Sequence, residues 1–180
     1  MKNKGRLARR IIAVMVCMTL VLAALPTGVF SAFAQTEKGK LKVTSISDIH
    51  YFADTEKGTG DTENGFSEAY NEWNDKGSRQ HNEVGTLLSA ALKKAADEKS
   101  DYVLLPGDLT FNGELAGHKE LAAKLEAFEK ETGIQVIVVN GNHDINNYNG
   151  VTFKNGVKES DEVTSPEAFR EIYKSEAKRS

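Results

Sequence analysis

The chain has 180 residues, of which 39% are hydrophobic and 27% are charged, an ordinary composition for a soluble globular protein. Its formal net charge is −3, but the first 34 residues hold five positive charges and no negative ones, so the rest of the chain has a net charge of −8. An acidic domain of this kind argues against a nucleic-acid-binding surface, which requires a basic face.

The amino end has the order of a secretory signal peptide. Lysines and arginines are concentrated in the first ten residues, an apolar run extends from Ile11 to Leu25, and Ala32-Phe33-Ala34 matches a small-residue cleavage site. We expect residues 1–34 to be a Sec-type signal peptide and the protein to be secreted or extracytoplasmic. The apolar run is shorter than the roughly 20 residues of a spanning helix. An uncleaved segment is the alternative, and it would be the only part associated with a membrane.

The single cysteine, Cys17, lies inside this apolar run and would leave with the signal peptide. The mature chain, residues 35–180, would then have neither disulfide nor thiol chemistry.

Hydrophobic patterning after residue 40 predicts three strands and two long helices. The strands are β-branched or alternating runs, and the helices have apolar residues at the spacing i, i+3, i+4 and i+7. In chain order the elements are a strand at 41–46, a helix at 81–99, a strand at 101–105, a helix at 114–132 and a strand at 134–139. This alternation calls for right-handed crossovers and a parallel sheet, so the predicted fold class is α/β.

Two of the connections are long. Residues 51–77 are rich in Gly, Asn, Asp and Glu, and their aromatic side chains either line a substrate cleft or pack locally. The aromatic residues in question, Phe66, Tyr70 and Trp73, are scattered through this connection. Residues 145–156 form an Asn- and Gly-rich loop. A last helix begins at Ser165-Pro166, where a capping residue precedes a proline at the first helical position.

Each predicted strand is followed by side chains that can bind a metal ion. They are Asp48 and His50 after the first strand, Asp108 after the second, and Asn142, His143 and Asp144 after the third. The carboxyl ends of neighbouring parallel strands lie close together, and ligands bind at this edge of α/β sheets. Residues i and i+2 of an extended strand share one face, so Asp48 and His50 can bind one ion together.

The donor types suit a pair of divalent ions. Carboxylate, imidazole and amide oxygen are ligands for Zn, Mn or Fe(II). Asp108, in the middle, can bridge two ions roughly 3.5–4 Å apart, which would polarise a phosphoryl oxygen and generate hydroxide near neutral pH. Each motif alone is also ordinary turn chemistry. Three such motifs at three predicted strand ends favour a metal site over chance.

The order of these motifs resembles the calcineurin-like metallophosphoesterase family. The motifs are Asp48-x-His50, Gly107-Asp108-x-x-x-x-Gly113 and Gly141-Asn142-His143-Asp144. The wider wording of residues 107–114 and 141–147 most resembles the cyclic-nucleotide phosphodiesterase-like branch. The resemblance covers nearly the whole mature chain and implies an α/β sandwich whose first sheet, with flanking helices, is the β-α-β-α-β part predicted above.

The resemblance also implies a role for each residue. Asp48 and His50 would hold the first metal, Asp108 would bridge, and Asn142 would hold the second metal. His143 would lie beside the phosphate, to stabilise its charge or protonate the leaving oxygen, and Asp144 would orient the imidazole. The cofactors would be two divalent ions (Mn, Fe or Zn), and the substrate a small phosphate ester.

Three positions argue against two other classes of the family. Purple acid phosphatases have an iron-binding tyrosine where this chain has Phe111. Ser/Thr protein phosphatases have arginine at the position of Asn112 and glutamate at the position of Asp144. We therefore expect neither an iron-tyrosinate site nor a protein phosphatase.

The family completes its metal sites with later histidines, whereas this chain has only His50, His81, His118 and His143. His81 and His118 are expected to be surface or capping residues. We expect the chain to be the N-terminal portion of the phosphoesterase domain, with the second sheet of the sandwich missing.

The expected function is that of an exported, metal-dependent phosphoesterase. It would hydrolyse a phosphodiester or phosphomonoester, with phosphodiesters favoured, through attack by a metal-bound hydroxide at a dinuclear centre. The alternative is a truncated, catalytically incompetent fragment that binds a metal or ligand.

Overall fold

In the computed structural model, residues 39–77 and 81–174 are described, and within them no helix is long and apolar enough to cross a membrane. The expected signal peptide, residues 1–34, lies outside these ranges. The larger of the two units of the chain starts at Leu41.

Three parallel strands form the main sheet, in the order β1-β2-β3. They are β1 (Val43–Ser45), β2 (Tyr102–Pro106) and β3 (Gln135–Val139). Residues Thr44, Val103 and Val136 lie opposite one another across the sheet. The predicted α/β class and the parallel sheet are confirmed, and β1 is shorter than the run that predicted it.

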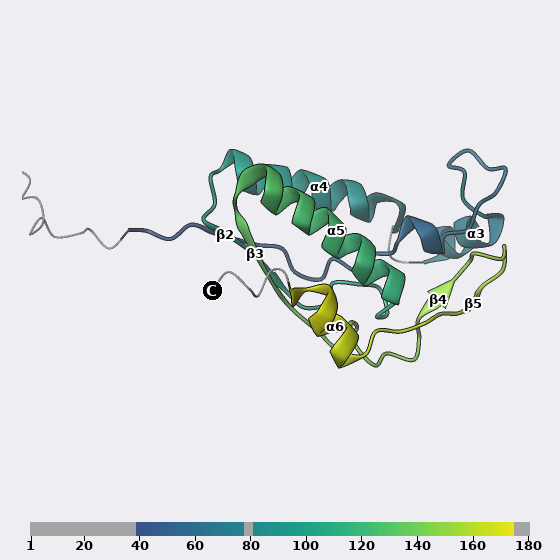
Figure 1. Ribbon diagram of the computed structural model, residues 1–180. Coiled ribbons are helices and arrows are strands. Elements are labelled where there is room, and N and C mark those ends of the chain that lie inside the picture. Colours follow the sequence, from purple (N-terminus) through teal and green to yellow (C-terminus); the bar gives the residue numbers. More distant parts are fainter. Residues whose placement is uncertain (1–38, 78–80, 175–180) are drawn as a thin grey trace, which may run out of the picture. The chain divides into compact units, whose positions relative to one another are not determined.

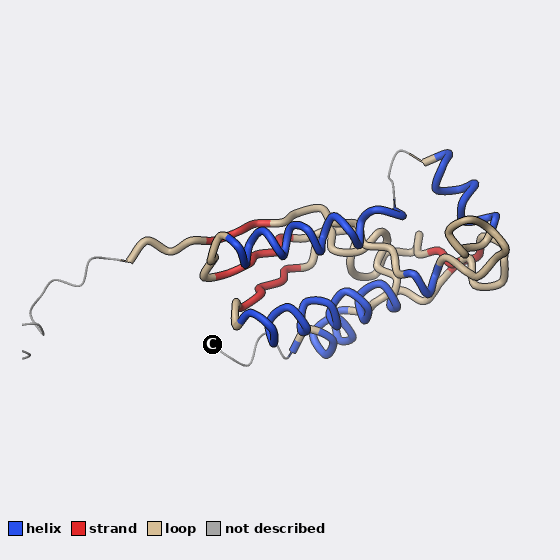
Figure 2. Tube along the Cα trace, turned by 90° about the horizontal axis from the view of Figure 1, so that it is seen from above, coloured by secondary structure: helices blue, strands red, loops and turns tan. Residues whose placement is uncertain are grey.

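Two helices connect the strands and lie on one face of the sheet (Figures 1 and 2). They are α4 (His81–Asp97) and α5 (Leu115–Thr132). Val103, Leu105 and Val136 are fully buried beneath them, whereas Ile137 and Val139, on the other face of β3, are 41% and 56% exposed. The core of this unit is therefore one layer of helices packed on one sheet face.

Helix α5 ends at Gly133, whose φ of 74° is the left-handed conformation that glycine adopts without strain. Near this end, the carboxylate of Glu129 accepts a hydrogen bond of 2.6 Å from the backbone N–H of Val136. This bond ties the last turns of α5 to β3, the strand at one edge of the sheet.

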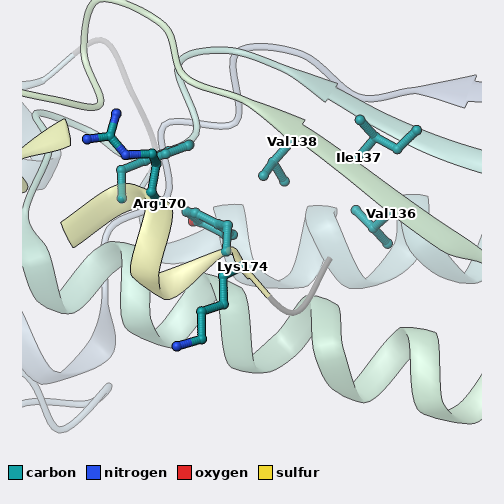
Figure 3. Close-up of a pocket in the computed structure, with 7 residues that line it drawn as sticks. Val136, Ile137, Val138, Arg170 and Lys174 are labelled. Carbon is teal, nitrogen blue, oxygen red and sulfur yellow. The ribbon is translucent and has the colours of Figure 1, made fainter. Parts of the chain in front are cut away.

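The last helix, α6 (Pro166–Ile172), begins where its cap predicted, since the Ser165 hydroxyl accepts a bond from the Ala168 N–H. Tyr173, at its end, is 4% exposed and packs beside α5. A groove of about 400 Å³ separates this helix from β3. Figure 3 shows the seven lining residues, with Val136, Ile137 and Val138 on β3 and Lys174 pointing away from that strand.

Four elements lie where the sequence predicts neither a helix nor a strand. The connection 51–77 contains a short 3-10 helix, η1 (Asp54–Glu56), and helix α3 (Glu68–Lys76). Residues 145–164 contain the antiparallel pair β4 (Val151–Thr152) and β5 (Glu159–Ser160). In the described residues this pair is the only sheet besides the main one.

Packing in an aromatic cluster of Phe52, Tyr70 and Phe153 explains why α3 forms despite its polar sequence. Ser67 caps the helix by accepting from the Tyr70 N–H, and Tyr70 is fully buried. Its ring packs on Phe52 and on Phe153, with centroid distances of 5.9 and 5.6 Å. Of the two interpretations of the aromatic residues in 51–77, local packing accounts for Tyr70. Helix α3 depends on contacts with residues outside it, so the hydrophobic periodicity of its own sequence could not predict it.

Candidate metal centre

The loops that follow β1 and β2 run side by side beyond the ends of the strands. The N–H groups of Asp48 and His50 donate to the carbonyls of Gly107 and Asp108, at 3.3 and 2.9 Å, and Tyr51 pairs in parallel with Thr110. These backbone bonds bring the first two motifs together without any contribution from their side chains.

Three predicted ligands adopt a strained backbone conformation. Asp48, His50 and Asp108 have φ values of 54°, 49° and 48°, in the left-handed region that few non-glycine residues occupy. We predicted that Asp48 and His50 share one face of an extended strand, but β1 already ends at Ser45. That geometric reason is wrong, because both residues lie beyond the strand and have left-handed instead of extended backbone angles. Strain of this kind is concentrated at functional sites.

The donor atoms of Asp48, His50 and Asp108 all lie within 4.8 Å of one another. The Asp108 carboxylate is divided between two neighbours, since Oδ2 lies 3.8 Å from His50 Nε2 and Oδ1 accepts from the His143 N–H at 3.1 Å. Two carboxylates and one imidazole are a donor set that suits Mn, Fe or Zn. The residues present therefore fit a divalent metal ion.

Gly141 allows the loop after β3 to approach this cluster. A Cβ at this position would lie 2.3 Å from Asp108 Oδ1 and 2.4 Å from its backbone nitrogen, distances that a real side chain does not tolerate. Gly107 has a φ of 91°, and a Cβ added to it would lie 3.2 Å from the Cα of Gly141. Both motif glycines are thus required by close contact between the second and third loops.

The third motif places Asn142 and His143 differently. Asn142 lies in the turn after β3 with its side chain exposed. The imidazole of His143 is partly buried, and its ring meets that of His50 edge-on, with centroids 5.0 Å apart. Nδ1 of His143 lies 2.8 Å from the Phe111 carbonyl oxygen and 3.0 Å from Asn112 Oδ1. The second loop therefore holds this histidine.

Asp144 makes other contacts than those expected. We predicted that it orients His143, but its carboxylate is fully buried and accepts from the N–H groups of Thr110 at 2.9 Å and Gly141 at 2.6 Å. These bonds join the loop after β2 to the loop after β3. Orientation of His143 falls to Phe111 and Asn112 instead, because both oxygens of Asp144 point at backbone donors.

The expectation that His118 is a surface or capping residue is wrong. It is fully buried, with Nε2 2.8 Å from the Asp144 carbonyl oxygen and Nδ1 3.0 Å from the Tyr173 hydroxyl. Burial lowers the pKa of this histidine, which favours the neutral ring. Its position on the helix could have revealed it, since His118 is three residues before Leu121 on the buried face of α5.

His81 is likewise only 4% exposed, and its ring stacks on that of Trp73 with centroids 4.9 Å apart. It shares the inward face of α4 with Leu88 and Leu92. The helical periodicity of α4 could therefore have predicted that His81 is buried, although it could not have predicted Trp73 as its partner.

Sequence reasoning also missed Glu114, which was assigned only as the start of a helix. It is 1% exposed, and its carboxylate accepts from the N–H groups of Asn112 at 2.8 Å and Val151 at 3.3 Å. Burial raises the pKa of Glu114 to about 7, against the opposing effect of these bonds.

Comparison with known proteins agrees with this geometry. The calcineurin-like phosphoesterase family model matches residues 41–177, which is more than half of the chain. A comparison with curated proteins finds no match. The resemblance drawn from the three motifs is confirmed, and the matched domain is one for metal-dependent hydrolysis of phosphoric esters.

Replacing Gly141 with alanine should weaken metal binding. The new Cβ would displace Asp108, and we expect about 10–100-fold weaker binding of Mn²⁺ in a calorimetric titration. Gly85→Ala is the matched control, because a Cβ there meets only Tyr51 Cε2 at an ordinary 3.7 Å. Equal affinities in the two variants would show that this close approach does not position Asp108.

Glu114 should make the chain less stable as the pH rises through neutrality. Its pKa is raised from 4.5 in the unfolded chain to about 7 in the folded one, so the folded chain binds the proton more tightly. This contribution is complete below pH 4.5 and is lost as the pH rises through about 7, a decrease of about 3 kcal/mol in the free energy of unfolding. Urea unfolding across this interval measures it. Glu114→Gln should flatten the profile, and an unchanged profile would contradict the assignment.

Proposed function

The chain belongs to the calcineurin-like phosphoesterase family, and we propose that it is an exported phosphodiesterase that acts on small phosphate esters at a dinuclear metal centre. The observation that carries the proposal is the convergence of Asp48, His50 and Asp108, whose donor atoms lie within 4.8 Å of one another. The family makes the domain a hydrolase of phosphoric esters, and the further steps below are our inference.

Asp48 and His50 would hold one ion, Asp108 would be shared, and Asn142 would hold the second. When bound, two divalent ions supply neutralisation of the phosphate charge and a lowered pKa for a nucleophilic water. Asn142 enters this assignment through its motif, and it lies exposed in the turn directly before His143.

His143 would contact the phosphate or give a proton to the leaving oxygen. Its backbone is tied to Asp108 by a bond of 3.1 Å and its ring to Phe111, so the imidazole is held at a fixed place beside the metal ligands. A general acid must be oriented in this way before it can act.

A binding role without turnover is the second candidate. One observation favours it. In the described part of the chain, the second ion would have only two of the predicted ligands, the shared Asp108 and the amide of Asn142. Tight binding of Mn²⁺ with no hydrolysis of any phosphate ester would support this role.

The bridging role of Asp108 can be tested with bis-p-nitrophenyl phosphate and Mn²⁺. We expect Asp108→Asn to lower kcat/KM about a thousandfold, or ~4 kcal/mol, because charge neutralisation and water activation both depend on this carboxylate. Asp97→Asn is the control, since that carboxylate is exposed on α4 and pairs only with Lys93. Activity that survives in Asp108→Asn would contradict a shared ligand.

Export rests on the order of charges and apolar residues in 1–34, as does the proposal that the membrane is met only through this segment. We expect the secreted protein to begin at Gln35, which amino-terminal sequencing of culture supernatant would establish. A protein retained with its first 34 residues would mean that the segment is an anchor.

A further inference from the structure

We propose that Asn112 is a positioning residue for His143, and that it fixes which ring nitrogen is left for the substrate. This inference rests on the proposed function, in which His143 acts beside the metal ions. Asn112 is not one of the predicted metal ligands. Ser/Thr protein phosphatases have arginine at its position.

The first step concerns the proton on Nδ1 of His143. This nitrogen lies 2.8 Å from the carbonyl oxygen of Phe111, and a carbonyl oxygen can only accept. Nδ1 must therefore carry a hydrogen. In the neutral ring, Nε2 then has the lone pair.

The second step fixes the orientation of the Asn112 amide independently. Its Nδ2 lies 3.1 Å from the carbonyl oxygen of Asn149, so this end of the amide must be the donor. Oδ1 consequently faces Nδ1 of His143 at 3.0 Å, and also accepts from Asn147 Nδ2 at 3.3 Å. The Phe111 carbonyl and the Asn112 amide oxygen therefore both require a hydrogen on Nδ1 of His143.

The third step is the frame behind Asn112. Its side chain is 8% exposed, and its backbone N–H donates to the buried carboxylate of Glu114 at 2.8 Å. The other oxygen of Glu114 accepts from Val151, at the start of β4. Glu114 therefore clamps the turn that carries Asn112 to the loop that carries Asn147 and Asn149.

These contacts give the histidine a neutral oriented partner in place of a carboxylate. Asp144, the carboxylate nearest in sequence, is occupied by Thr110 and Gly141. Among the residues that the structure describes, His143 bonds to side chains and carbonyls through Nδ1 alone. Nε2 is the ring nitrogen left to face the substrate, and it can donate to a phosphate oxygen or to the leaving group only when the ring carries a proton there as well.

The test is the tautomer of His143, measured by ¹⁵N NMR of the histidine rings in the complete, metal-free chain. We expect the Nδ1–H form in the wild-type protein. Asn112→Leu should lower the ratio of Nδ1–H to Nε2–H forms about fivefold, the effect of one lost hydrogen bond. A wild-type ring protonated on Nε2, or an unchanged ratio in Asn112→Leu, would overturn the proposal.

Two further variants separate positioning from a structural role. Asn112→Asp keeps an oxygen next to Nδ1 but loses the bond to Asn149, so the tautomer should stay as in wild type. Asn147→Ala removes the other contact to Oδ1 and should also leave the tautomer unchanged. If all three variants alter the ring alike, Asn112 only supports the fold. The wild-type spectrum decides the assignment even where Asn112→Leu does not fold.

The kinetic arm uses bis-p-nitrophenyl phosphate with Mn²⁺. Asn112→Leu should lower kcat about fivefold and change KM by less than about twofold, because ring orientation matters at the transition state more than in binding. Because the ring spectra need neither metal nor turnover, an inactive wild-type chain would contradict the proposed function and leave the tautomer result standing.

Discussion

The buried carboxylate of Asp144 joins the loop after β2 to the loop after β3, and the geometry of the metal centre depends on this junction. This carboxylate accepts from the N–H groups of Thr110 and Gly141, and the backbone carbonyl oxygen of Asp144 is hydrogen-bonded to His118. A buried carboxylate is costly unless its oxygens are satisfied, so these donors must stay in place. Because His118 also bonds to Tyr173, the packing of α5 and α6 is continuous with the position of the two loops.

Around this junction the chain accepts unfavourable local conformations. Asp48, His50 and Asp108 hold left-handed backbone angles, which cost roughly 1–3 kcal/mol each in non-glycine residues. They persist because the first loop is paired to the second through main-chain bonds, while Gly141 lets the third loop pack against Asp108. The layer of α4 and α5 on the sheet provides the rigid base from which all three loops extend.

The parts that could be predicted from sequence are those with a local signature. Strand patterns, the caps of α5 and α6, and the position of Asp48, His50 and Asp108 at strand ends all follow from short-range rules. The missed features depend on partners far along the chain. Helix α3 forms through contacts with Phe52 and Phe153. The ring of His143 is held by the Phe111 carbonyl and the Asn112 amide, and neither partner could be recognised from its residue type. The inward position of His118 was readable from helical spacing, but polar residues are easily assigned to the surface.

The bond between Glu129 and the Val136 N–H has a consequence for how copies of this chain meet one another. Among the residues that the structure describes, β3 lies at an edge of the sheet, and an edge strand with free N–H groups is a template onto which another chain can add a strand. A carboxylate from α5 accepts from one of those donors, the N–H of Val136, and brings its negative charge to the amino end of the strand. Strand addition there would have to break a buried bond and approach that charge. We therefore expect the acidic side chain to disfavour strand addition at this end of β3.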